Sequence, residues 1–316
     1  MGIRNLLYLF KKYAPNSMKE TRISDYKNKV LGIDANLMIY KMVYAIRKNG
    51  YDIVNQDRIV THIHGMLQKL IGFKKYNITP IFVFDGLQPK IKSNTLKKRS
   101  EFQKAMKKRY DNALTENDKK KYFYLQSDIL YQELEDCKKL ITIFGYQYIE
   151  AIGEADTVLA YLSKRKLVHY VVSDDLDLLI FGSLNLLKDF TVDKNKKINE
   201  IDRQKVLKIL KINQDQLIDI AIMIGCDYCK SVSGIGPIKA YKIIQDYESL
   251  QKAVKHKAIS LSGYKNIQKY FKKYKVNKGI KVYKGDTINY GELNTFLYNN
   301  NYKLERIKEI TKKLNF

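Results

Sequence analysis

The sequence Val171-Val-Ser-Asp-Asp-Leu-Asp-Leu-Leu-Ile-Phe-Gly182 places three carboxylates, those of Asp174, Asp175 and Asp177, inside an apolar run. The apolar residues predict burial. A buried carboxylate is strongly destabilising unless a positive charge lies close to it. This stretch therefore predicts a buried strand that ends in acids, with cations nearby.

The net charge of the chain predicts a polyanionic partner. The 316 residues carry a formal charge of +25, and the isoelectric point is near 9.6. Such a protein attracts nucleic acid. An AT-rich genome would also enrich lysine, but it would spread the charge evenly. The charge is instead concentrated in a predicted helix, Lys90–Arg109, and in a second basic helical segment from Lys119 to Lys121 onward. We therefore expect a binding surface there.

Two classes of protein are disfavoured by composition. No apolar run reaches the roughly 20 residues of a membrane-spanning helix, so no membrane segment is expected. Three cysteines, Cys137, Cys226 and Cys229, are too few for a disulfide framework in a chain of this size, and the four histidines are not placed to complete a zinc site. Ordinary reduced thiols in an intracellular protein are expected.

Short apolar runs alternate with longer amphipathic stretches, which predicts an α/β fold with a mainly parallel central sheet flanked by helices. Helical periodicity is expected over Leu37–Arg47 and Ile59–Phe73, and beyond about Ile201 only helices are expected. The predicted strands are Val30–Ile33, Pro80–Phe84, Tyr146–Ile149, His169–Ser173 and Leu184–Lys188.

Three of the predicted strands end in aspartate: the first in Asp34, the second in Asp85 and the fourth in Asp174-Asp175. Sites in open parallel sheets form outside the carboxyl ends of the strands. Any one of these residues could be a helix cap or a turn residue. As a set, they predict one acidic cleft.

Further acids join this set. Glu154 and Asp156 open a predicted helix after the third strand, where the helix dipole alone could explain them. Asp227 ends a later apolar helical run. Such a cluster would repel itself and raise its own pKa values. Divalent cations relieve the repulsion, and Mg²⁺ suits carboxylate and water ligands. We expect metal ions opposite these acids.

An acidic cleft in a basic chain is typical of a nuclease, because two metal ions can activate water and stabilise a phosphodiester under attack. A basic surface would hold the remaining phosphates. Lys92 and Arg99 are two helical turns apart and share one face, so both could point at the phosphate. The other lysines of this helix are expected on a solvated face.

A second motif points to duplex DNA. Gly234-Ile-Gly236 precedes Pro237 and a predicted helix, which is the pattern of a helix-hairpin-helix whose exposed amides bind phosphates without reading the sequence. Lys239 would strengthen the contact. Because no strand leads into the motif and a third glycine is missing, it is not a dinucleotide-binding fingerprint.

Together these residues resemble the flap endonuclease family of structure-specific 5′ nucleases. The resemblance runs from Met1 to the predicted last helix, Lys303–Leu314. It rests on Gly2-Ile3, Gly32-Ile-Asp34-Ala-Asn, Val83-Phe-Asp85-Gly, Lys97-Lys-Arg99-Ser, Gly153-Glu-Ala-Asp156, Ser173-Asp-Asp-Leu-Asp177, and Gly225-Cys-Asp-Tyr-Cys229 through Gly234-Ile-Gly-Pro237, all in the family's order.

The resemblance implies a PIN-like 5′ nuclease core over 1–200, with a helical gateway and cap at about 90–132. It implies a helix-hairpin-helix region with C-terminal helices over 201–316. Lys92 and Arg99 match the catalytic pair, and Tyr40 matches an aromatic on which a base stacks. Gly2, Arg47, Lys97, Lys98, Gly234, Gly236 and Lys239 would contact DNA. The seven metal acids are Asp34, Asp85, Glu154, Asp156, Asp175, Asp177 and Asp227.

The resemblance also implies cofactors and partners. Two Mg²⁺ ions are expected, with Mn²⁺ as a substitute, and a K⁺ ion at the helix-hairpin-helix. The expected substrate is branched DNA with a 5′ flap, cut by a monomer at sites of DNA replication, in the nucleus or at a viral replication site. Asp156 stands where the family usually has glutamate. The C-terminal peptide that binds the sliding clamp is not recognisable, which would fit a viral or reduced-genome member.

Three alternatives stay open at this point. A related 5′-3′ exonuclease or junction and gap endonuclease would use the same chemistry. A non-catalytic DNA-binding scaffold would predict gaps in the acid set, and all seven positions are acidic. An unrelated metal-dependent phosphotransferase would explain Asp175 and Asp177 but would leave the hairpin motif and the basic helix without a role.

Overall fold

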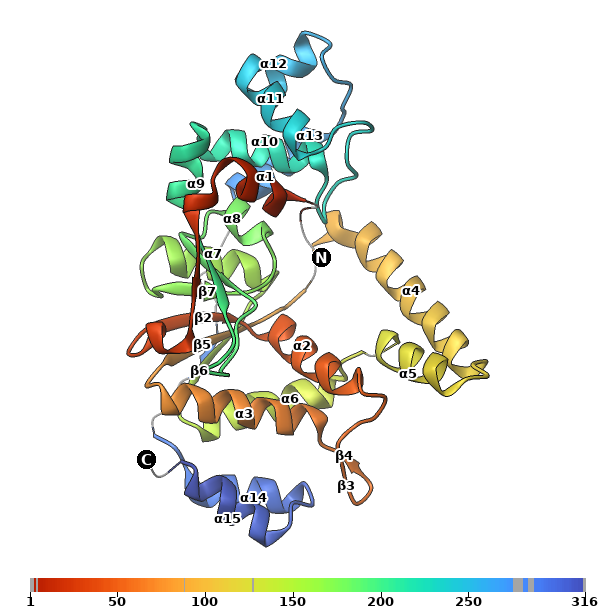
Figure 1. Ribbon diagram of the computed structural model, residues 1–316, viewed down its shortest axis with the longest axis vertical. Coiled ribbons are helices and arrows are strands. Elements are labelled where there is room, and N and C mark those ends of the chain that lie inside the picture. Colours follow the sequence, from red (N-terminus) through yellow and green to blue (C-terminus); the bar gives the residue numbers. More distant parts are fainter. Residues whose placement is uncertain are drawn as a thin grey trace.

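A computed structural model shows an eight-stranded sheet whose centre is parallel (Figure 1). It describes residue 3 and residues 5–87, 89–126, 128–274, 281–283 and 287–314. The five predicted strands are confirmed and form this parallel centre, in the spatial order β8-β7-β2-β5-β6. Their bounds are β2 (Val30–Asp34), β5 (Thr79–Phe84), β6 (Gln147–Glu150), β7 (Tyr170–Val172) and β8 (Asn185–Lys188).

Antiparallel strands extend both edges of the sheet. On one side β9 (Ile198–Asp202) pairs with β8, and β1 (Met18–Thr21) pairs with β9. On the other side β10 (Lys281–Tyr283) pairs with β6. The expectation that only helices follow Ile201 was therefore wrong at β10. A separate hairpin of β3 (Val54–Asn55) and β4 (Arg58–Ile59) includes Ile59, which was expected to begin a helix.

The strands bury side chains on both faces, because neighbouring residues point to opposite sides of a pleated sheet. In β5, Val83 belongs to one hydrophobic cluster while Phe82 and Phe84 belong to the other. In β7, Val171 and Val172 divide in the same way. Burial on both faces requires helices on both faces, as the α/β prediction expected.

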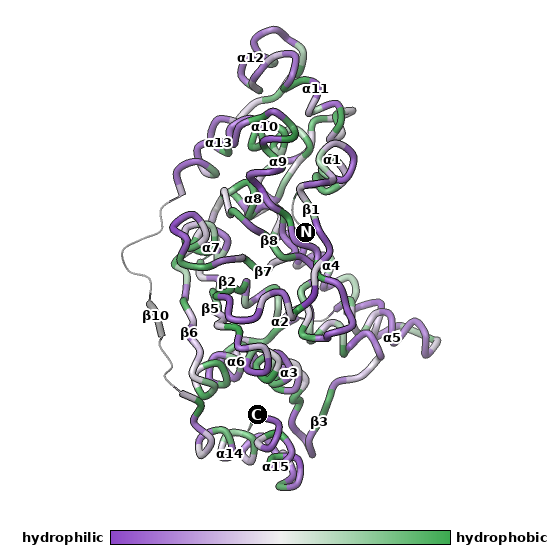
Figure 2. Tube along the Cα trace, turned by 60° about the vertical axis from the view of Figure 1, so that its left-hand side comes forward, coloured by the Kyte–Doolittle hydropathy of each residue, from purple (hydrophilic) through white to green (hydrophobic). Residues whose placement is uncertain are grey.

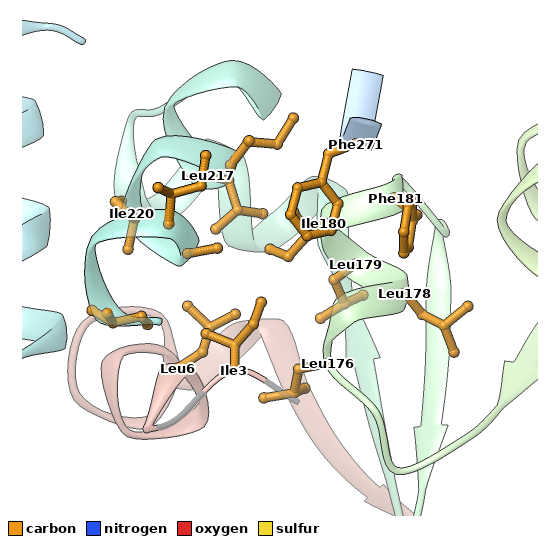
Figure 3. Close-up of a cluster of buried hydrophobic side chains, with 14 of the residues drawn as sticks. Ile3, Leu6, Leu176, Leu178, Leu179, Ile180, Phe181, Leu217, Ile220 and Phe271 are labelled. Atoms are coloured by element: carbon orange, nitrogen blue, oxygen red, sulfur yellow. The ribbon is translucent and has the colours of Figure 1, made fainter. Parts of the chain in front are cut away.

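One cluster joins the first helix, the helices after β6 and β7, and the helical region beyond β9. Figure 3 shows its centre, where Ile3 and Leu6 face Leu176 and Leu217, with Phe181 and Phe271 nearby. The helices are α1 (Leu6–Tyr13), α7 (Ala155–Lys164), α8 (Asp177–Phe181), α9 (Arg203–Leu210), α10 (Gln214–Ile224), α11 (Pro237–Tyr247), α12 (Leu250–Lys255) and α13 (Tyr264–Lys272).

The other cluster covers the opposite face and includes the last two helices, which lie at the far end of the molecule from α10–α13 (Figure 1). The predicted division into two domains near residue 200 stays a prediction. Of the later helices, α9–α13 pack in the first cluster, and the last two helices pack in the second. The helices are α2 (Ala35–Arg47), α3 (Thr61–Lys75), α6 (Tyr131–Ile143), α14 (Tyr290–Asn299) and α15 (Leu304–Lys312). Short 3₁₀ turns span Pro15–Ser17, Ile23–Tyr26 and Lys90–Lys92.

Two further helices, α4 (Ser93–Asp111) and α5 (Glu116–Leu125), form an arch that projects from the body (Figure 1). Thr115 caps α5 by accepting a hydrogen bond from the amide of Asp118 at 3.1 Å. The arch is hydrophilic along most of its length (Figure 2). Within the described ranges, no helix is long and apolar enough to cross a membrane.

Candidate active site

Acids lie together at the carboxyl ends of three neighbouring parallel strands. Asp34 is the last residue of β2, and its Oδ1 accepts the amide of Leu37 at 3.1 Å, which caps α2. Asp85 follows β5 and accepts the amide of Ala155 at 2.8 Å. Asp175 follows β7, which pairs with β2. The parallel register brings all three to one edge of the sheet.

Acids from two other segments complete the wall. Glu154 and Asp156 stand at the start of α7, and Asp227 lies in a turn after α10. Gly225 makes that turn possible, because its φ is +88° and a Cβ there would lie 2.7 Å from the amide nitrogen of Ser231. The resulting cavity has a volume of about 890 Å³. Its lining includes Asp34, Asp85, Glu154, Asp156, Asp175 and Asp227, together with Tyr40, Lys92 and Arg99.

Asp177, the seventh expected acid, lies outside this lining. It is 1% exposed, and its Oδ1 has no hydrogen-bond partner. Burial and the charge of Asp175 raise the pKa of Asp177 well above its usual range. A buried carboxylate oxygen without a donor is the feature that a nearby cation would stabilise.

The clustered carboxylates repel one another. Burial and the charge of Asp85 raise the pKa of Asp34 to about 7, although the Ser173 hydroxyl donates to Asp34 at 2.9 Å. Burial, and then the charges of Asp175 and Asp34, raise the pKa of Asp156 well above its usual range. Within the described residues, the cations around the cavity therefore leave part of this repulsion uncompensated.

Lys92 and Arg99 both point into the cavity. The Lys92 ammonium lies 2.5 Å from Oε1 of Glu154 and 3.4 Å from Oδ2 of Asp227. Arg99 donates to the same Asp227 oxygen at 2.6 Å. Burial lowers the pKa of Lys92, but the charge and hydrogen bond of Glu154, together with the charges of Asp156 and Asp227, outweigh burial and raise the pKa, so Lys92 stays cationic.

The donor set fits hard divalent cations. In the described part of the chain, no three His, Cys, Asp or Glu side chains already stand in a ligand arrangement, and Glu154 and Asp227 bind Lys92 and Arg99 instead. However, the donors are all oxygens, several carboxylates have raised pKa values, and one oxygen of Asp177 is unpartnered. Mg²⁺ prefers this chemistry.

Asp174 differs from its neighbours although it also lines the cavity. The ammonium of Lys41 donates to one of its oxygens, and the amide of Asp189 donates to the other at 2.8 Å. Burial would raise the pKa of Asp174, but these donors outweigh it and the pKa is lowered. The protein itself therefore compensates the charge of Asp174.

Tyr40 and Arg47 share helix α2 but have different surroundings. Tyr40 lines the cavity and stacks on Tyr44, with ring centroids 5.8 Å apart. Arg47, expected to contact DNA, is buried, and it binds Asp52 at 2.8 Å and Glu133 at 3.3 Å. Its guanidinium faces the interior, so we assign Arg47 a structural role.

The other expected DNA contacts lie on the surface. Lys97 and Lys98 are exposed on α4. Gly234 has a φ of +70°, and Gly236 precedes α11, on whose first turn Lys239 lies. Gly2 falls outside the described residues.

Sequence reasoning missed two residues that contact a candidate metal acid. Tyr228 and Tyr270 donate hydrogen bonds to Oε2 of Glu154, at 2.8 and 2.5 Å. Tyr228 could have been suspected because it follows Asp227. Nothing local in the sequence marks Tyr270, which lies on α13, 116 residues after Glu154.

Two protein-family models match the parts of the chain that carry these acids. The XPG N-terminal domain matches residues 1–106, and the XPG I-region matches residues 145–227. Flap endonuclease 1 of Theileria annulata is 35% identical over 322 residues, 99% of this chain and 64% of that protein. Flap endonuclease 1 of Entamoeba histolytica is 35% identical over 263 residues, 81% of this chain and 70% of that protein.

A solved structure, flap endonuclease-1 from Methanococcus jannaschii, matches with a TM-score of 0.73 and 27% identity, covering 96% of both chains. The fold is thus the PIN-like α/β fold of these nucleases. The family models, the sequence relatives and the solved structure all indicate the same family, and the chain belongs to the flap endonuclease family. It spans just under two thirds of the length of the curated Theileria relative.

Proposed function

We propose that this chain is a structure-specific 5′ flap endonuclease that uses two Mg²⁺ ions, in DNA replication, repair or recombination. Its substrate would be branched DNA, cut near the junction of single and double strand. The cavity carries the proposal, because six of the seven candidate metal acids line it together with Lys92 and Arg99, in a chain of charge +25. A phosphodiester with its metal ions is the partner that such mixed charge would accept.

The seven acids would hold the ions, six from the lining of the cavity and Asp177 from its buried position beside Asp175. When bound, the ions would supply a nucleophilic water and stabilise charge on the phosphate under attack. Asp156, one methylene shorter than the family's usual glutamate, would reach its ion directly or through water. The protein itself holds Asp34, Asp85 and Asp175 at the ends of neighbouring strands, which would help to fix the spacing of the site.

Lys92 and Arg99 would stabilise negative charge that develops on the phosphate. The Arg99 side chain is 37% exposed, so an entering phosphate can reach its N–H groups. Lys92 is buried and lines the cavity, so it would act on a phosphate that has entered it. Both bind carboxylates in this structure, and these contacts hold their positive charges close to the expected position of the scissile phosphate.

The surrounding segments would position the DNA. Tyr40 would stack on a base beside the scissile phosphate, and the segment from about 90 to 132 would act as the gateway and cap around the single-stranded flap. Lys97 and Lys98 would bind its phosphates. Gly234, Gly236 and Lys239 would hold downstream duplex, with a K⁺ ion bound through backbone carbonyls of the helix-hairpin-helix.

Several finer proposals accompany this function. The chain would also have 5′-3′ exonuclease activity, accept Mn²⁺ in place of Mg²⁺ and work as a monomer at sites of DNA replication. We propose a nuclease unit over 1–200 and a helix-hairpin-helix unit over 201–316.

The direct test is cleavage of labelled 5′-flap, gapped, nicked and four-way DNA by the purified chain with Mg²⁺. We expect fastest cleavage of the flap substrate, and no cleavage with EDTA or in the Asp227→Ala variant. A folded wild-type protein that left the flap intact would contradict the proposal. Faster cleavage of four-way or nicked DNA would favour the junction nuclease or exonuclease alternative.

A further inference from the structure

Glu154 is held by three donors from three segments of the chain. Lys92 binds its Oε1 at 2.5 Å, while the hydroxyls of Tyr228 and Tyr270 donate to its Oε2 at 2.8 and 2.5 Å. The carboxylate is 2% exposed, so water hardly competes for these positions. Among the candidate metal acids of the described residues, only Glu154 accepts hydrogen bonds from two tyrosines.

Tyr270 reaches this site from the helical region. Its helix, α13, is fixed by Phe271, whose ring lies 4.8 Å from that of Phe181 in α8 (Figure 3). The Tyr270 ring lies 5.8 Å from Phe181 and 5.0 Å from Tyr228. This packing restricts the phenol to a narrow range of positions, and its hydroxyl meets Glu154 within that range.

We propose that Tyr270 is a positioning residue that fixes the orientation of the Glu154 carboxylate for metal binding, and that it thereby links α13 to the acid cavity. This inference rests on the proposed function, because it requires Glu154 to serve a metal ion. It goes beyond that function by assigning a role to a residue of the C-terminal helical region.

The hydrogen-bonding capacity of a carboxylate supports this role. An ionised carboxylate has about four acceptor positions on its two oxygens. Lys92, Tyr228 and Tyr270 occupy three of them, so one remains for an ion or its bound water. Three fixed donors leave the carboxylate little freedom to rotate, and the remaining position then points in one direction.

Both phenols remain donors at neutral pH. Burial, and then Glu154 itself, raise the pKa of Tyr228 and of Tyr270 above the usual range of tyrosine. A neutral hydroxyl adds no further positive charge beside Glu154, where the Lys92 ammonium already lies. A lysine at position 270 would instead compete with the metal ion for the negative charge of Glu154.

Loss of the Tyr270 hydroxyl should weaken metal binding more than it affects folding. Groups that orient metal ligands typically change metal affinity by about 10- to 100-fold when removed. Tyr270→Phe keeps the ring that packs on Phe181 and Tyr228, so the aromatic cluster should persist. Tyr274→Phe is the matched control, because it removes a hydroxyl that donates to the carbonyl of Phe181 at 3.2 Å in the same cluster.

The experiment compares wild type, Tyr270→Phe, Tyr228→Phe and Tyr274→Phe as full-length chains. Free Mn²⁺ is measured by electron paramagnetic resonance during titration, without DNA. Flap cleavage is then measured as a function of Mg²⁺ and DNA concentration. We expect Tyr270→Phe to raise the Kd for Mn²⁺ about tenfold or more and to lower the rate at limiting Mg²⁺. The KM for DNA should be unchanged, and excess Mg²⁺ should restore the rate.

Each outcome decides the question. Wild-type affinity for Mn²⁺ in Tyr270→Phe, or an equal loss in Tyr274→Phe, would overturn the positioning role. A defect that excess Mg²⁺ does not repair would also overturn it. If the wild-type chain neither bound Mn²⁺ in this cavity nor cleaved flap DNA, the proposed function itself would fail, and this result is distinguishable from the others.

Discussion

The acid cavity and the arch above it are built in opposite ways. The cavity lies at the ends of central strands, and Asp34, Glu154 and Asp156 within it are buried. The arch of α4 and α5 is mostly solvated, and α5 has no buried residue. The arch contacts the body through hydrogen bonds from Arg99 and Thr95 to Asp227 and through an edge-to-face contact between the rings of Tyr124 and Tyr44.

The two regions meet different physical requirements, one for binding metal ions and one for binding a flexible strand. Metal chemistry needs oxygens held at fixed spacing, which rigid strand ends provide. The proposed gateway for a single strand would need positive charge and little buried area, so that it could order around its ligand at low cost in free energy. The two regions meet at Asp227, where both Arg99 and Lys92 bind.

The largest expected effect comes from removing charge in the cavity. Asp175→Asn should lower flap cleavage by about 10³-fold or more, because a metal ligand is lost. DNA binding should persist, and the metal-free protein should melt at a higher temperature because a buried repulsion is relieved. Single-turnover kinetics, fluorescence anisotropy and calorimetry measure these three quantities.

Asp174→Asn is the matched control for that variant. Asp174 is adjacent in sequence and also lines the cavity, but Lys41 compensates its charge. Its loss should lower cleavage by less than about tenfold, since no ligand is removed. Equal losses in the two variants would contradict the assignment of Asp175 as a ligand and Asp174 as its neighbour.

A smaller effect is expected where the arch meets the cavity. Arg99→Ala should lower kcat by about 10²-fold, because a donor to the developing phosphate charge is lost. Lys98→Ala, one residue away but exposed, should leave kcat almost unchanged, weaken DNA binding and reduce the slope of log affinity against log salt by about 1. If Lys98→Ala lowered kcat as much as Arg99→Ala, the distinction between the two positions would be wrong.

The pKa of Asp34 predicts how stability depends on pH. Folding raises this pKa from an ordinary value of about 3.9 to about 7, so between these values the folded chain binds more protons than the unfolded chain. Stability should therefore fall as pH rises from about 4 to about 7. In EDTA, we expect a lower Tm at pH 7.5 than at pH 5. Mg²⁺ should raise Tm more at pH 7.5, because ions bind the ionised acids.

The variant Asp34→Asn tests that explanation. It removes the titrating group and should flatten the dependence of Tm on pH in EDTA. An unchanged slope in this variant would show that other groups control the stability. A larger Mg²⁺ stabilisation at pH 5 than at pH 7.5 would contradict the sign of the linkage.

The smallest effect concerns the attachment of the arch. Tyr124 meets Tyr44 edge to face, with ring centroids 5.0 Å apart, and such a pair contributes about 0.5–1.5 kcal/mol. Tyr124→Ala should speed hydrogen exchange in α5 without changing the global Tm. Tyr122→Ala is the control, since Tyr122 contacts Lys121 of the same helix. Equal exchange in both variants would contradict this anchoring role.

The parallel centre of the sheet was predictable from sequence, because strands buried on both faces are continuous apolar runs. The edge strands were not. Met18-Lys-Glu-Thr21 and Ile198-Asn-Glu-Ile-Asp202 are short and mixed in polarity, and only their pairing identifies them. Ile59 was assigned to a helix because its apolar spacing fits one, but the β3–β4 hairpin takes it and α3 begins at Thr61.

In the candidate site, the acids could be predicted from the sequence, but their long-range partners could not. Acids that follow strands are visible in the sequence, since strand ends converge in a parallel sheet. Contacts made by long side chains across the fold are not visible. Arg47 was expected to contact DNA but is buried and binds Glu133, 86 residues away, and Tyr270 reaches Glu154 from another helix. Tertiary packing alone decides such partners.

The most direct test of the whole account is anomalous scattering from crystals soaked in Mn²⁺. We expect two peaks about 3.5–4 Å apart in the cavity, bordered by carboxylates of Asp34, Asp85, Glu154, Asp156, Asp175, Asp177 and Asp227. A well-ordered cavity without manganese, with the ions bound elsewhere on the chain, would contradict the central claim that these acids form a metal centre.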